Sequence, residues 1–590
     1  MNGLVQQTTV GPRTDVPALL WHFFKVYRRR TLIVVALLTV AGLAEGFSVL
    51  ALLPFVQLAL SGNGAHAGHV WQWISACLAL FGLAPSVGSL LTLIVIGALL
   101  KAAVTLLAMK EVGYAVGQMM TDLRRRLVVA LMEARWSYFL TRPLGLFANA
   151  ICAEAIRAGV SYQQSARLAA AFIQAVIYAA ATAVVSWQIA LFALIAGTGG
   201  AIIFRRVVSI GHNAGERQTD LMKSLAVRMT DTLQGIKAIK AMGAEKSAIP
   251  FLDKEINELD DAQKSQVWSG ELLRVAQEPL LVAILALGIY GAIEIEGQSI
   301  PTLMITALLF YRLFNRFQVM QEIYQQIGIG ASAYWSVRSL GTEAEREAER
   351  SSKRGLISHA VPCIEFDAVS FRYAVHPVLQ EVSLRVKPGE FIVITGQSGV
   401  GKTTMLDLIS GLLTPASGVV LVDGVDLKEM DLRPWRTRLG YVPQEPLLLH
   451  DTIYRNISLG DQAISREHAR EALSAAGLWR LIADLPEGMD TIVGERGGRF
   501  SGGQRQRISL ARALARCPAV LLLDEITAGL DRDTEHEVCL TLRALAGKMT
   551  LFAVSHQPAI VGIADRAFRL HEGRVQKLPS ASGPLPAVRA

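Results

Sequence analysis

Cysteine is scarce in this chain of 590 residues, which has only Cys77, Cys152, Cys363, Cys517 and Cys539. These residues are far apart and include no C-x-x-C pair, which argues against a zinc site and against a disulfide framework. Cysteine without such partners usually behaves as a small apolar side chain. We therefore expect all five to be core or membrane residues with no chemistry of their own.

Charged residues are also few, at 18% of the chain, whereas hydrophobic residues make up 52%. Ordinary soluble proteins have roughly 25% charged residues, so part of this chain is expected to lie in lipid. The net charge of +8 is compatible with nucleic-acid binding. In a membrane protein, however, a basic cytoplasmic side explains the same excess, and we expect no nucleic-acid partner. The length of the chain predicts two or three domains.

Long apolar runs are confined to the first half of the sequence. Each is close to the roughly 20 residues that a helix needs to cross a bilayer. They lie near 32–60, 87–109, 167–186, 188–207, 272–293 and 300–320, which predicts six membrane-spanning helices. The first run follows "VYRRR" and is too long for the apolar region of a signal peptide, so it is interpreted as an uncleaved membrane helix.

The distribution of Lys and Arg between these runs predicts the orientation. The segments 61–86, 186–188 and 294–299 contain neither residue, whereas 110–166 and 208–271 contain many. By the positive-inside rule, the basic segments and both termini should be cytoplasmic.

The two basic segments are long and do not have the composition of turns. In the first, apolar residues recur at steps of three and four, which predicts an amphipathic helix that continues the second span into the cytoplasm. These residues are Val112, Val116, Met119, Leu123, Leu127 and Ala130. Breaks at "TRPLG" (141–145) and "TDTLQG" (230–235) are where such stalks are expected to turn. That they contact another domain there is an expectation that rests partly on the family resemblance described below.

Glu45 and Lys101 are ionisable residues inside predicted spans. A charge in hydrocarbon is costly, so such residues usually have a partner or a function. We expect that they pair or line a polar pathway, unless one of them extends to the membrane surface.

The second half of the chain has the pattern of an α/β domain. Residues 337–358 are charged and small and indicate a surface helix and a linker. Alternating strands follow at 364–373 and 381–389, and further on apolar runs that suit buried strands alternate with helical patterns. This order predicts a mainly parallel sheet with an antiparallel edge.

A glycine-rich loop lies between the apolar strand "FIVIT" (391–395) and a helical segment. The loop fits the pattern G-x-x-x-x-G-K-T in the strand–loop–helix context that identifies a phosphate-binding loop. Its backbone N–H groups and the helix N-terminus would hold phosphate, Lys402 would reach the β- and γ-phosphates, and the Thr403 hydroxyl would bind Mg²⁺. The nucleotide-binding residues predicted here are Gly396, Gln397, Ser398, Gly399, Val400, Gly401, Lys402, Thr403 and Thr404.

A second apolar run, "AVLLLDE" (519–525), ends in two carboxylates. Asp524 at the end of a strand suits a Mg²⁺ contact, and Glu525 suits activation of the water that attacks the γ-phosphate. A D-E pair after an apolar run means little alone. Together with a phosphate-binding loop it predicts a nucleotide hydrolase.

The order of further motifs resembles the ATP-binding cassette (ABC) transporters. "FSGGQ" (500–504) is similar to the signature loop of that family, with Phe500 where Leu is usual. "GERG" (494–497) resembles the segment that precedes this loop in exporters. "AGLD" (528–531) is similar to the loop that crosses between subunits, with Gly529 where Ala is usual and Asp531 retained. Six spans followed by one such domain resemble a half-transporter of the exporter type.

The resemblance also implies roles for single residues. Gln444 in "YVPQ" matches the glutamine that senses Mg²⁺ and the transmembrane contacts, and it would act with Glu525 and with His556, which is similar to the switch histidine. Tyr373 lies where the family stacks an aromatic ring on adenine. Ser501, Gly502, Gly503 and Gln504 would bind the γ-phosphate held by a second copy of the chain, because a hydroxyl and N–H groups at a helix start form an anion site. Arg505 and Arg507 could add positive potential.

The resemblance therefore implies a multi-domain membrane protein: an all-α six-helix transmembrane domain and an α/β P-loop domain with an antiparallel β edge and a helical subdomain. The expected parts are an N-terminal segment (1–31), a transmembrane domain (32–330), a linker (331–361), a nucleotide-binding domain (362–578) and a tail (579–590). The implied ligands are ATP and Mg²⁺, with the metal held by Thr403, Gln444 and Asp524.

The expected activity is ATP-driven export or flipping of a hydrophobic or amphipathic substrate, such as a peptide, lipid, lipid-linked sugar or drug. Two copies, or one copy and a homologous half-transporter, would alternate between inward-facing and outward-facing states in membrane lipid. An ATP-gated channel or regulatory subunit is the alternative, although one Lys and one Glu hardly make a conductive ring. An importer is disfavoured because the spans and the nucleotide domain are fused in the exporter order. An exporter that cleaves leader peptides is disfavoured because only about thirty residues precede the first span. The expected location is a bacterial inner membrane, with the nucleotide domain in the cytoplasm.

Overall fold

The computed structural model describes residues 16–52, 55, 69–80, 86–294, 300–349, 360–528 and 530–579. The chain divides into two compact units. One consists of Met1–Ala134 and Tyr138–Ala348, and the other of Arg135–Ser137 and Glu349–Ala590. Residues 1–15 of the first predicted segment, part of the predicted linker, Gly529 and nearly all of the predicted tail lie outside the described residues.

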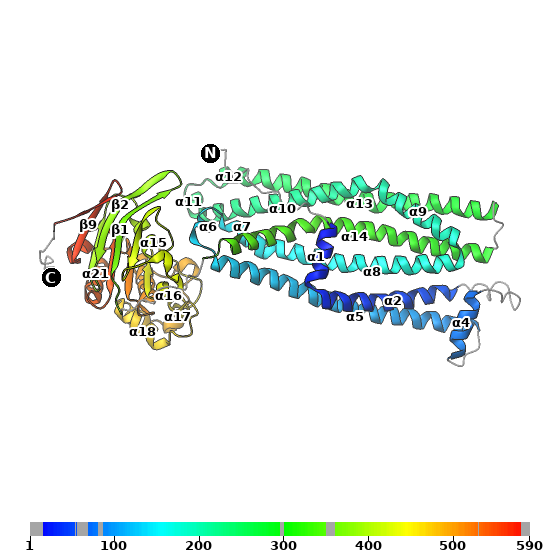
Figure 1. Cartoon of the computed structure of the whole chain (residues 1–590), viewed down its shortest axis with the longest axis horizontal. Helices are drawn as coiled ribbons and strands as arrows, with labels where there is room; N and C mark the ends of the chain where they lie inside the picture. The colour runs from blue at the N-terminus through cyan, green and yellow to red at the C-terminus, as the bar shows by residue number, and fades with distance from the viewer. Residues whose placement is uncertain are drawn as a thin grey trace. The chain divides into compact units, whose positions relative to one another are not determined.

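The first unit is built from helices, several of them much longer than a bilayer is thick (Figure 1). Its main helices are α1 (Val16–Val26), α2 (Arg28–Leu50), α4 (His69–Leu80), α5 (Val87–Glu133), α8 (Ala155–Val185), α9 (Trp187–Ile203), α10 (Arg205–Gln234), α13 (Pro250–Glu294) and α14 (Ile300–Arg346). Between them lie α6 (Trp136–Leu140), α7 (Leu144–Asn149), the π-helix η2 (Ala150–Glu154), α11 (Ile236–Ala241) and α12 (Glu245–Ala248). Helix α14 continues to Arg346, so the predicted linker at 331–361 begins within a helix.

Helices occupy all six places where a span is predicted, but they differ in composition. Within the described residues, four helical segments are long and apolar enough to cross a membrane: Arg28–Leu50, Val87–Glu133, Leu144–Val184 and Pro250–Tyr290. Helices α9 and α10 make a fifth if the 47° bend between them lies within one span. The predicted span 300–320 is not among them, because Arg312, Asn315 and Arg316 interrupt its apolar run.

The predicted stalk helix is confirmed. Helix α5 extends over 47 residues, and Val112, Met119 and Leu127 on its apolar face are buried. The predicted breaks are also present, since α7 begins after Pro143 and α10 ends before Gly235. The two stalks approach closely at the first break, where a Cβ on Gly145 would lie 2.6 Å from the Ala226 carbonyl oxygen. Whether these breaks contact another domain stays a prediction.

The second unit contains two sheets, and its α/β class is as predicted. The antiparallel sheet has the order β2-β1-β4-β5, and the larger, mainly parallel sheet has the order β10-β9-β3-β8-β7-β6. The strands are β1 (Ile364–Tyr373), β2 (His376–Val386), β3 (Phe391–Thr395), β4 (Ser417–Val422), β5 (Val425–Asp426), β6 (Leu439–Val442), β7 (Val520–Asp524), β8 (Thr550–Val554), β9 (Arg566–His571) and β10 (Arg574–Lys577). The helices are α15 (Lys402–Ile409), α16 (Leu432–Thr437), α17 (Ile453–Ser458), α18 (Arg466–Ala475), α19 (Trp479–Ala483), α20 (Gly502–Leu514), α21 (Arg532–Leu545) and α22 (Pro558–Ile563).

The core of this unit determines where its polar residues collect. Strands β7 and β8 are buried along their whole length, which matches their apolar sequences and the burial of parallel strands on both faces. Strands β3, β6, β7 and β8 are parallel neighbours, so their carboxyl ends lie at one edge of the sheet. Residues that follow these strands are therefore brought together there.

The expectation that every cysteine is a core or membrane residue is wrong for two of them. Cys539 is buried, but Cys152 and Cys517 are exposed and Cys363 is partly exposed. Cys152 lies in the π-helix, whose buried residues are Ala150 and Glu154, and Cys517 lies in the turn before β7 with a φ of +49°, so neither belongs to the apolar face of a regular helix or strand. The side chain of Cys77 is outside the described residues.

Candidate functional site

The phosphate loop lies between β3 and α15, as the sequence predicts. Gly401 has a φ of +108°, and a Cβ at this position would lie 2.4 Å from Cγ1 of Val378. Gly399 has a φ of +80°. Side chains are rarely tolerated in this left-handed region, so glycine is required for the loop to turn into the helix.

The side chain of Lys402 extends back into the loop and is only 6% exposed. Its ammonium group donates to the carbonyl oxygens of Gly396 and Gln397, each at 3.0 Å. It also lies 3.4 Å from Oε1 of Glu525. A buried cation is thus fixed inside a loop of backbone groups, which suits a polyphosphate.

Thr403 and Asp524 meet at the same edge of the sheet. The Thr403 hydroxyl donates to Oδ2 of Asp524 at 3.0 Å, and Oδ1 is 3.2 Å away. Burial raises the pKa of Asp524, and the hydrogen bond from Thr403 opposes that rise. No group of three or more His, Cys, Asp or Glu side chains within the described residues could hold a metal. One hydroxyl and one carboxylate suit Mg²⁺, which usually takes one or two carboxylates together with substrate phosphates.

Glu525 combines an uncommon backbone conformation with several side-chain contacts. It has a φ of +47°, which is uncommon for a residue with a side chain, and its N–H donates to the Val554 carbonyl at 2.9 Å. Gln444 donates from Nε2 to its Oε2 at 3.0 Å, and Nδ1 of His556 lies 3.8 Å from its Oε1. Strained backbone of this kind persists where the surrounding structure enforces it, often at functional sites. The structure therefore brings Lys402, Gln444 and His556 around one carboxylate.

Asp407 is a residue of this region that the sequence analysis missed. It lies on α15, and burial together with the nearby charge of Asp524 raises its pKa to about 6. Tyr441 on β6 is affected in the same way: its burial, together with the nearby charges of Asp524 and Asp407, raises its pKa. The available signal was an acidic residue four positions after Thr403, which places both on one face of the helix.

Tyr373 ends β1 and is 41% exposed, so one face of its ring is accessible to a ligand. Phe371 supports the ring edge-on, with 4.9 Å between the ring centroids and an interplanar angle of 85°. This is compatible with the predicted adenine contact, which stays a prediction.

The signature-like loop forms a separate group. Ser501 caps α20: its hydroxyl accepts from the Gln504 N–H at 3.3 Å, and the Gln504 side chain accepts from the Ser501 N–H at 2.9 Å. Phe500 is buried, so the departure from Leu falls at a packing position. Within the described residues, no hydrogen bond or ion pair joins 501–504 to the phosphate loop or to Glu525.

Residues near the signature-like loop make hydrogen bonds and ion pairs within the second unit. Asp531 caps α21 by accepting from the Thr534 N–H at 3.0 Å, and a Cβ on Gly503 would lie 3.0 Å from Cγ2 of Thr534. Arg505 donates to the Phe500 carbonyl at 2.9 Å, and Arg507 pairs with Glu537 at 2.6 Å. The pairing with Glu537 reduces the positive potential that Arg507 was expected to add.

A charged network lies in the helical unit. Lys101 of α5 lies 2.5 Å from Oε1 of Glu45 on α2, so the expected pair is present. The hydroxyl of Tyr178 on α8 donates to the same oxygen, and Nη1 of Arg312 on α14 lies 3.5 Å from it. The guanidinium of Arg316 lies over the Tyr178 ring at 6.0 Å. Arg312 and Arg316 were not among the residues predicted to pair within the spans, although both lie in the predicted span 300–320.

Comparison with known families assigns both parts of the chain to models of the same kind of protein. Residues 31–317 match the model of the ABC transporter transmembrane region, and residues 379–528 match the ABC transporter model. The chain belongs to the ABC transporter family. One transmembrane region followed by one cassette is the arrangement of a half-transporter of the exporter type.

Curated relatives of this ABC half-transporter are named ATP-dependent lipid A-core flippase. The relative from Burkholderia pseudomallei (strain 1710b) is 33% identical over 369 residues, which is 61% of each chain. That from Chromobacterium violaceum is 30% identical over 398 residues, 66% of this chain and 67% of its own. That from Syntrophus aciditrophicus is 29% identical over 474 residues, 78% of this chain and 77% of its own. The chain thus spans about three fifths of the length of the Burkholderia relative.

Among solved structures, a bacterial Atm1-family ABC exporter with ATP bound has the same fold. The TM-score is 0.77, and the match covers 93% of this chain and 95% of the other at 24% sequence identity.

Proposed function

We propose that this chain is one half of an ATP-driven exporter or flippase that moves a hydrophobic or amphipathic substrate across a membrane. One observation carries the proposal: Glu525 follows β7 in a strained conformation, in contact with Lys402 and Gln444, in a chain that also contains a transmembrane region. Strain at a carboxylate beside a phosphate loop favours a hydrolase over a simple nucleotide-binding module.

In this proposal ATP is the substrate of the second unit. Lys402 binds the β- and γ-phosphates, and the ring of Tyr373 stacks on adenine. Glu525 accepts a proton from the attacking water, while His556 and Gln444 hold the γ-phosphate and the water in place. Thr403, Asp524 and Gln444 would hold Mg²⁺, which when bound neutralises charge that develops on the phosphates.

The proposed site is complete only in a dimer. The N–H groups of Gly502 and Gly503 begin a 13-residue helix, and they have no bond to the phosphate loop of their own chain within the described residues. We infer that the segment 501–504 closes over the γ-phosphate held by a second copy, or by a homologous half-transporter. The cap on Ser501 keeps these N–H groups pointing out of the helix start, where an anion binds well.

Coupling to transport then follows from differential affinity. ATP binds the closed pair of cassettes better than the open pair, and hydrolysis removes that preference. The long helices α5, α10, α13 and α14 carry the movement to the membrane region. The basic connections, with the cassette, lie in the cytoplasm. A bacterial inner membrane is the proposed location, and the relatives named above are flippases of bacteria.

The test is ATP-dependent accumulation of candidate amphiphiles in proteoliposomes, with the wild type and Glu525→Gln compared at equal protein. Transport by the wild type and its loss in the variant support the proposal. Currents that outlast single ATP cycles, with no accumulation, would instead indicate the ATP-gated channel.

A further inference from the structure

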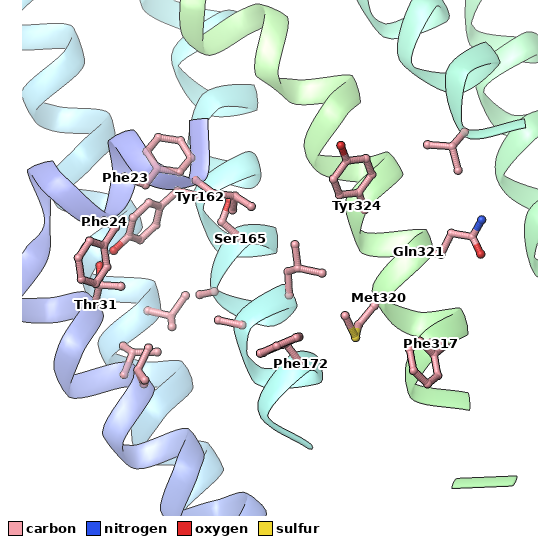
Figure 2. A pocket seen from close by; sticks show the side chains of 18 of the residues that line it. Phe23, Phe24, Thr31, Tyr162, Ser165, Phe172, Phe317, Met320, Gln321 and Tyr324 are labelled. Atoms are coloured by element: carbon pink, nitrogen blue, oxygen red, sulfur yellow. The ribbon is translucent and has the colours of Figure 1, made fainter. Parts of the chain in front are cut away.

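The helical unit contains a cavity of about 640 Å³ between α1, α2, α5, α8, α9, α10 and α14. Figure 2 shows its lining: Phe23 and Phe24 of α1, Tyr162 and Phe172 of α8, and Phe317 and Met320 of α14 approach the space from different helices. Arg205 is the one charged residue among the described lining residues. A cavity of this size and polarity is typical of a site for an apolar ligand.

The charged network lies on the same helix faces as this cavity. Val34 lines the cavity, and Glu45 follows eleven positions later on α2; Val112 lines it, and Lys101 precedes it by eleven positions on α5. Eleven residues are about three helical turns, so each pair shares a face and is about 16 Å apart along the axis. On α14, Arg316 lies four positions before Met320, one turn from the cavity lining. The network therefore continues the surface of the cavity beyond one of its ends.

Positive charge is in excess within the network. Within the described residues, Lys101 and Arg312 contact one carboxylate, that of Glu45, which is 5% exposed, and Arg316 lies over the ring of Tyr178, whose hydroxyl binds the same carboxylate. The contacts of Arg312 with Glu45 and Tyr178 are long, both 3.5 Å, and use one nitrogen.

Arg316 has even less compensation. It contacts the face of the Tyr178 ring, and its buried Nε has no hydrogen-bond partner within the described residues. Uncompensated cations among membrane helices are costly and mark binding sites or pathways. Guanidinium groups with unused N–H donors are suited to phosphate or carboxylate, which they bind through parallel hydrogen bonds.

We infer that the cavity and the network form one site for an amphipathic anion, with hydrocarbon in the cavity and the anionic group at Arg312 and Arg316. The inference rests on the proposed function and narrows its substrate class. An uncharged drug or a neutral peptide would leave both guanidinium groups without a counter-charge. A free anion would leave the cavity empty.

The test is direct binding to the full-length chain in phosphatidylcholine nanodiscs, without ATP. The probes are dodecyl phosphate, an uncharged dodecyl oligo(ethylene glycol) ether, and inorganic phosphate, with binding to empty nanodiscs subtracted. The wild type is expected to bind dodecyl phosphate about tenfold or more tightly than the ether, because charge-assisted hydrogen bonds are worth more than one factor of ten. Inorganic phosphate should bind far more weakly than dodecyl phosphate.

Two variants separate the parts of the site. Arg312→Gln combined with Arg316→Gln should abolish the preference for the phosphate probe and leave binding of the ether within about twofold. Ala169→Phe places a large side chain in the cavity and should weaken both dodecyl probes alike. Arg205→Gln, which removes a cation from the other part of the lining, should leave the preference unchanged.

Three results would overturn the inference. One is a lost preference in Arg205→Gln with an intact preference in the Arg312/Arg316 variant. A second is a lower melting temperature of the Arg312/Arg316 variant with unchanged affinities, which would make the arginines purely structural. The third is equal affinity of the wild type for both dodecyl probes. These binding measurements contain no ATP, so none of the three results bears on the proposed ATP-driven function. Conversely, if the wild type binds the probes as expected but fails to hydrolyse ATP in a separate assay, the proposed function is contradicted and the binding site is not.

Discussion

Replacement of Glu525 by Gln changes one charge at the centre of the site and almost nothing else. The side chains have the same shape, the residue can keep its φ of +47°, and the amide oxygen can still accept the 3.0 Å hydrogen bond from Gln444. What is lost is the carboxylate that lies 3.4 Å from the Lys402 ammonium and would accept a proton from water. General-base catalysis contributes roughly 10²–10⁴-fold, so we expect the rate of phosphate release to fall by about that factor.

Affinity for ATP should not fall with the rate, because the variant removes a negative charge from the neighbourhood of the phosphates. The expected product is a closed, ATP-bound pair with little turnover. The assay is phosphate release in lipid nanodiscs, together with retention of labelled ATP on gel filtration. Glu572→Gln is a matched control, since Glu572 also has a positive φ, +49°, but lies in the turn before β10. Phosphate release by Glu525→Gln at the rate of the wild type or of this control would refute the role of Glu525.

Three further predictions concern single residues. Lys402→Ala should weaken ATP binding about tenfold to a hundredfold, because it removes a buried cation inside the phosphate loop. Equilibrium binding of ATP measures this change. Unchanged affinity would contradict the assignment of this loop to phosphate binding. Asp407 has a pKa of about 6 in the folded protein, whereas its ordinary pKa is 3.8. The folded state therefore binds this proton more tightly than the unfolded state, so the contribution of Asp407 to the stability of the fold is fully present below about pH 3.8 and is lost as the pH rises to about 6. Asp407→Asn should remove this decline. Near pH 7 the free energy of unfolding should rise by about 1–2 kcal/mol, after allowance for the partial exposure of the side chain. Melting temperatures with the same pH dependence in both proteins would contradict the prediction. Glu45→Gln should destabilise the helical unit by about 3–5 kcal/mol, because it leaves Lys101 without its carboxylate. In thermal unfolding, the double variant with Lys101→Gln should recover part of this loss. If the losses of the two substitutions simply add, the two residues are not a stabilising pair.

Local patterns in the sequence were sufficient for the elements that carry the nucleotide site. The strand before Gly396, the helix after Gly401 and the buried strand ending at Asp524 are all present, because each is encoded within about a dozen residues. The meeting of Thr403 with Asp524, 121 positions away, also followed from sequence, since both lie at the carboxyl ends of parallel strands of one sheet, β3 and β7, with β8 between them.

What could not be predicted depends on distant packing. The left-handed conformation of Glu525 occurs together with its bond to Val554 on the next strand, and no residue near Glu525 in sequence signals it. The raised pKa of Asp407 similarly requires Asp524 to be close. Arg312 and Arg316 were visible in the sequence, but only the fold shows that they share the environment of Glu45.

The capping roles of Ser501 and Asp531 show a different difficulty. Both residues match family motifs, yet both also make the hydrogen bonds that any helix start needs. A motif that serves fold and function at once cannot be assigned to one of them by pattern alone. Only a measurement on paired chains separates these roles.

The central claim is that two chains complete each other's nucleotide sites, with the segment 501–504 of one facing the phosphate loop of the other. The most direct test is ATP turnover per chain in nanodiscs loaded with one copy or with two. The account predicts turnover in discs with two copies and almost none in discs with one. Equal turnover per chain in both would contradict it.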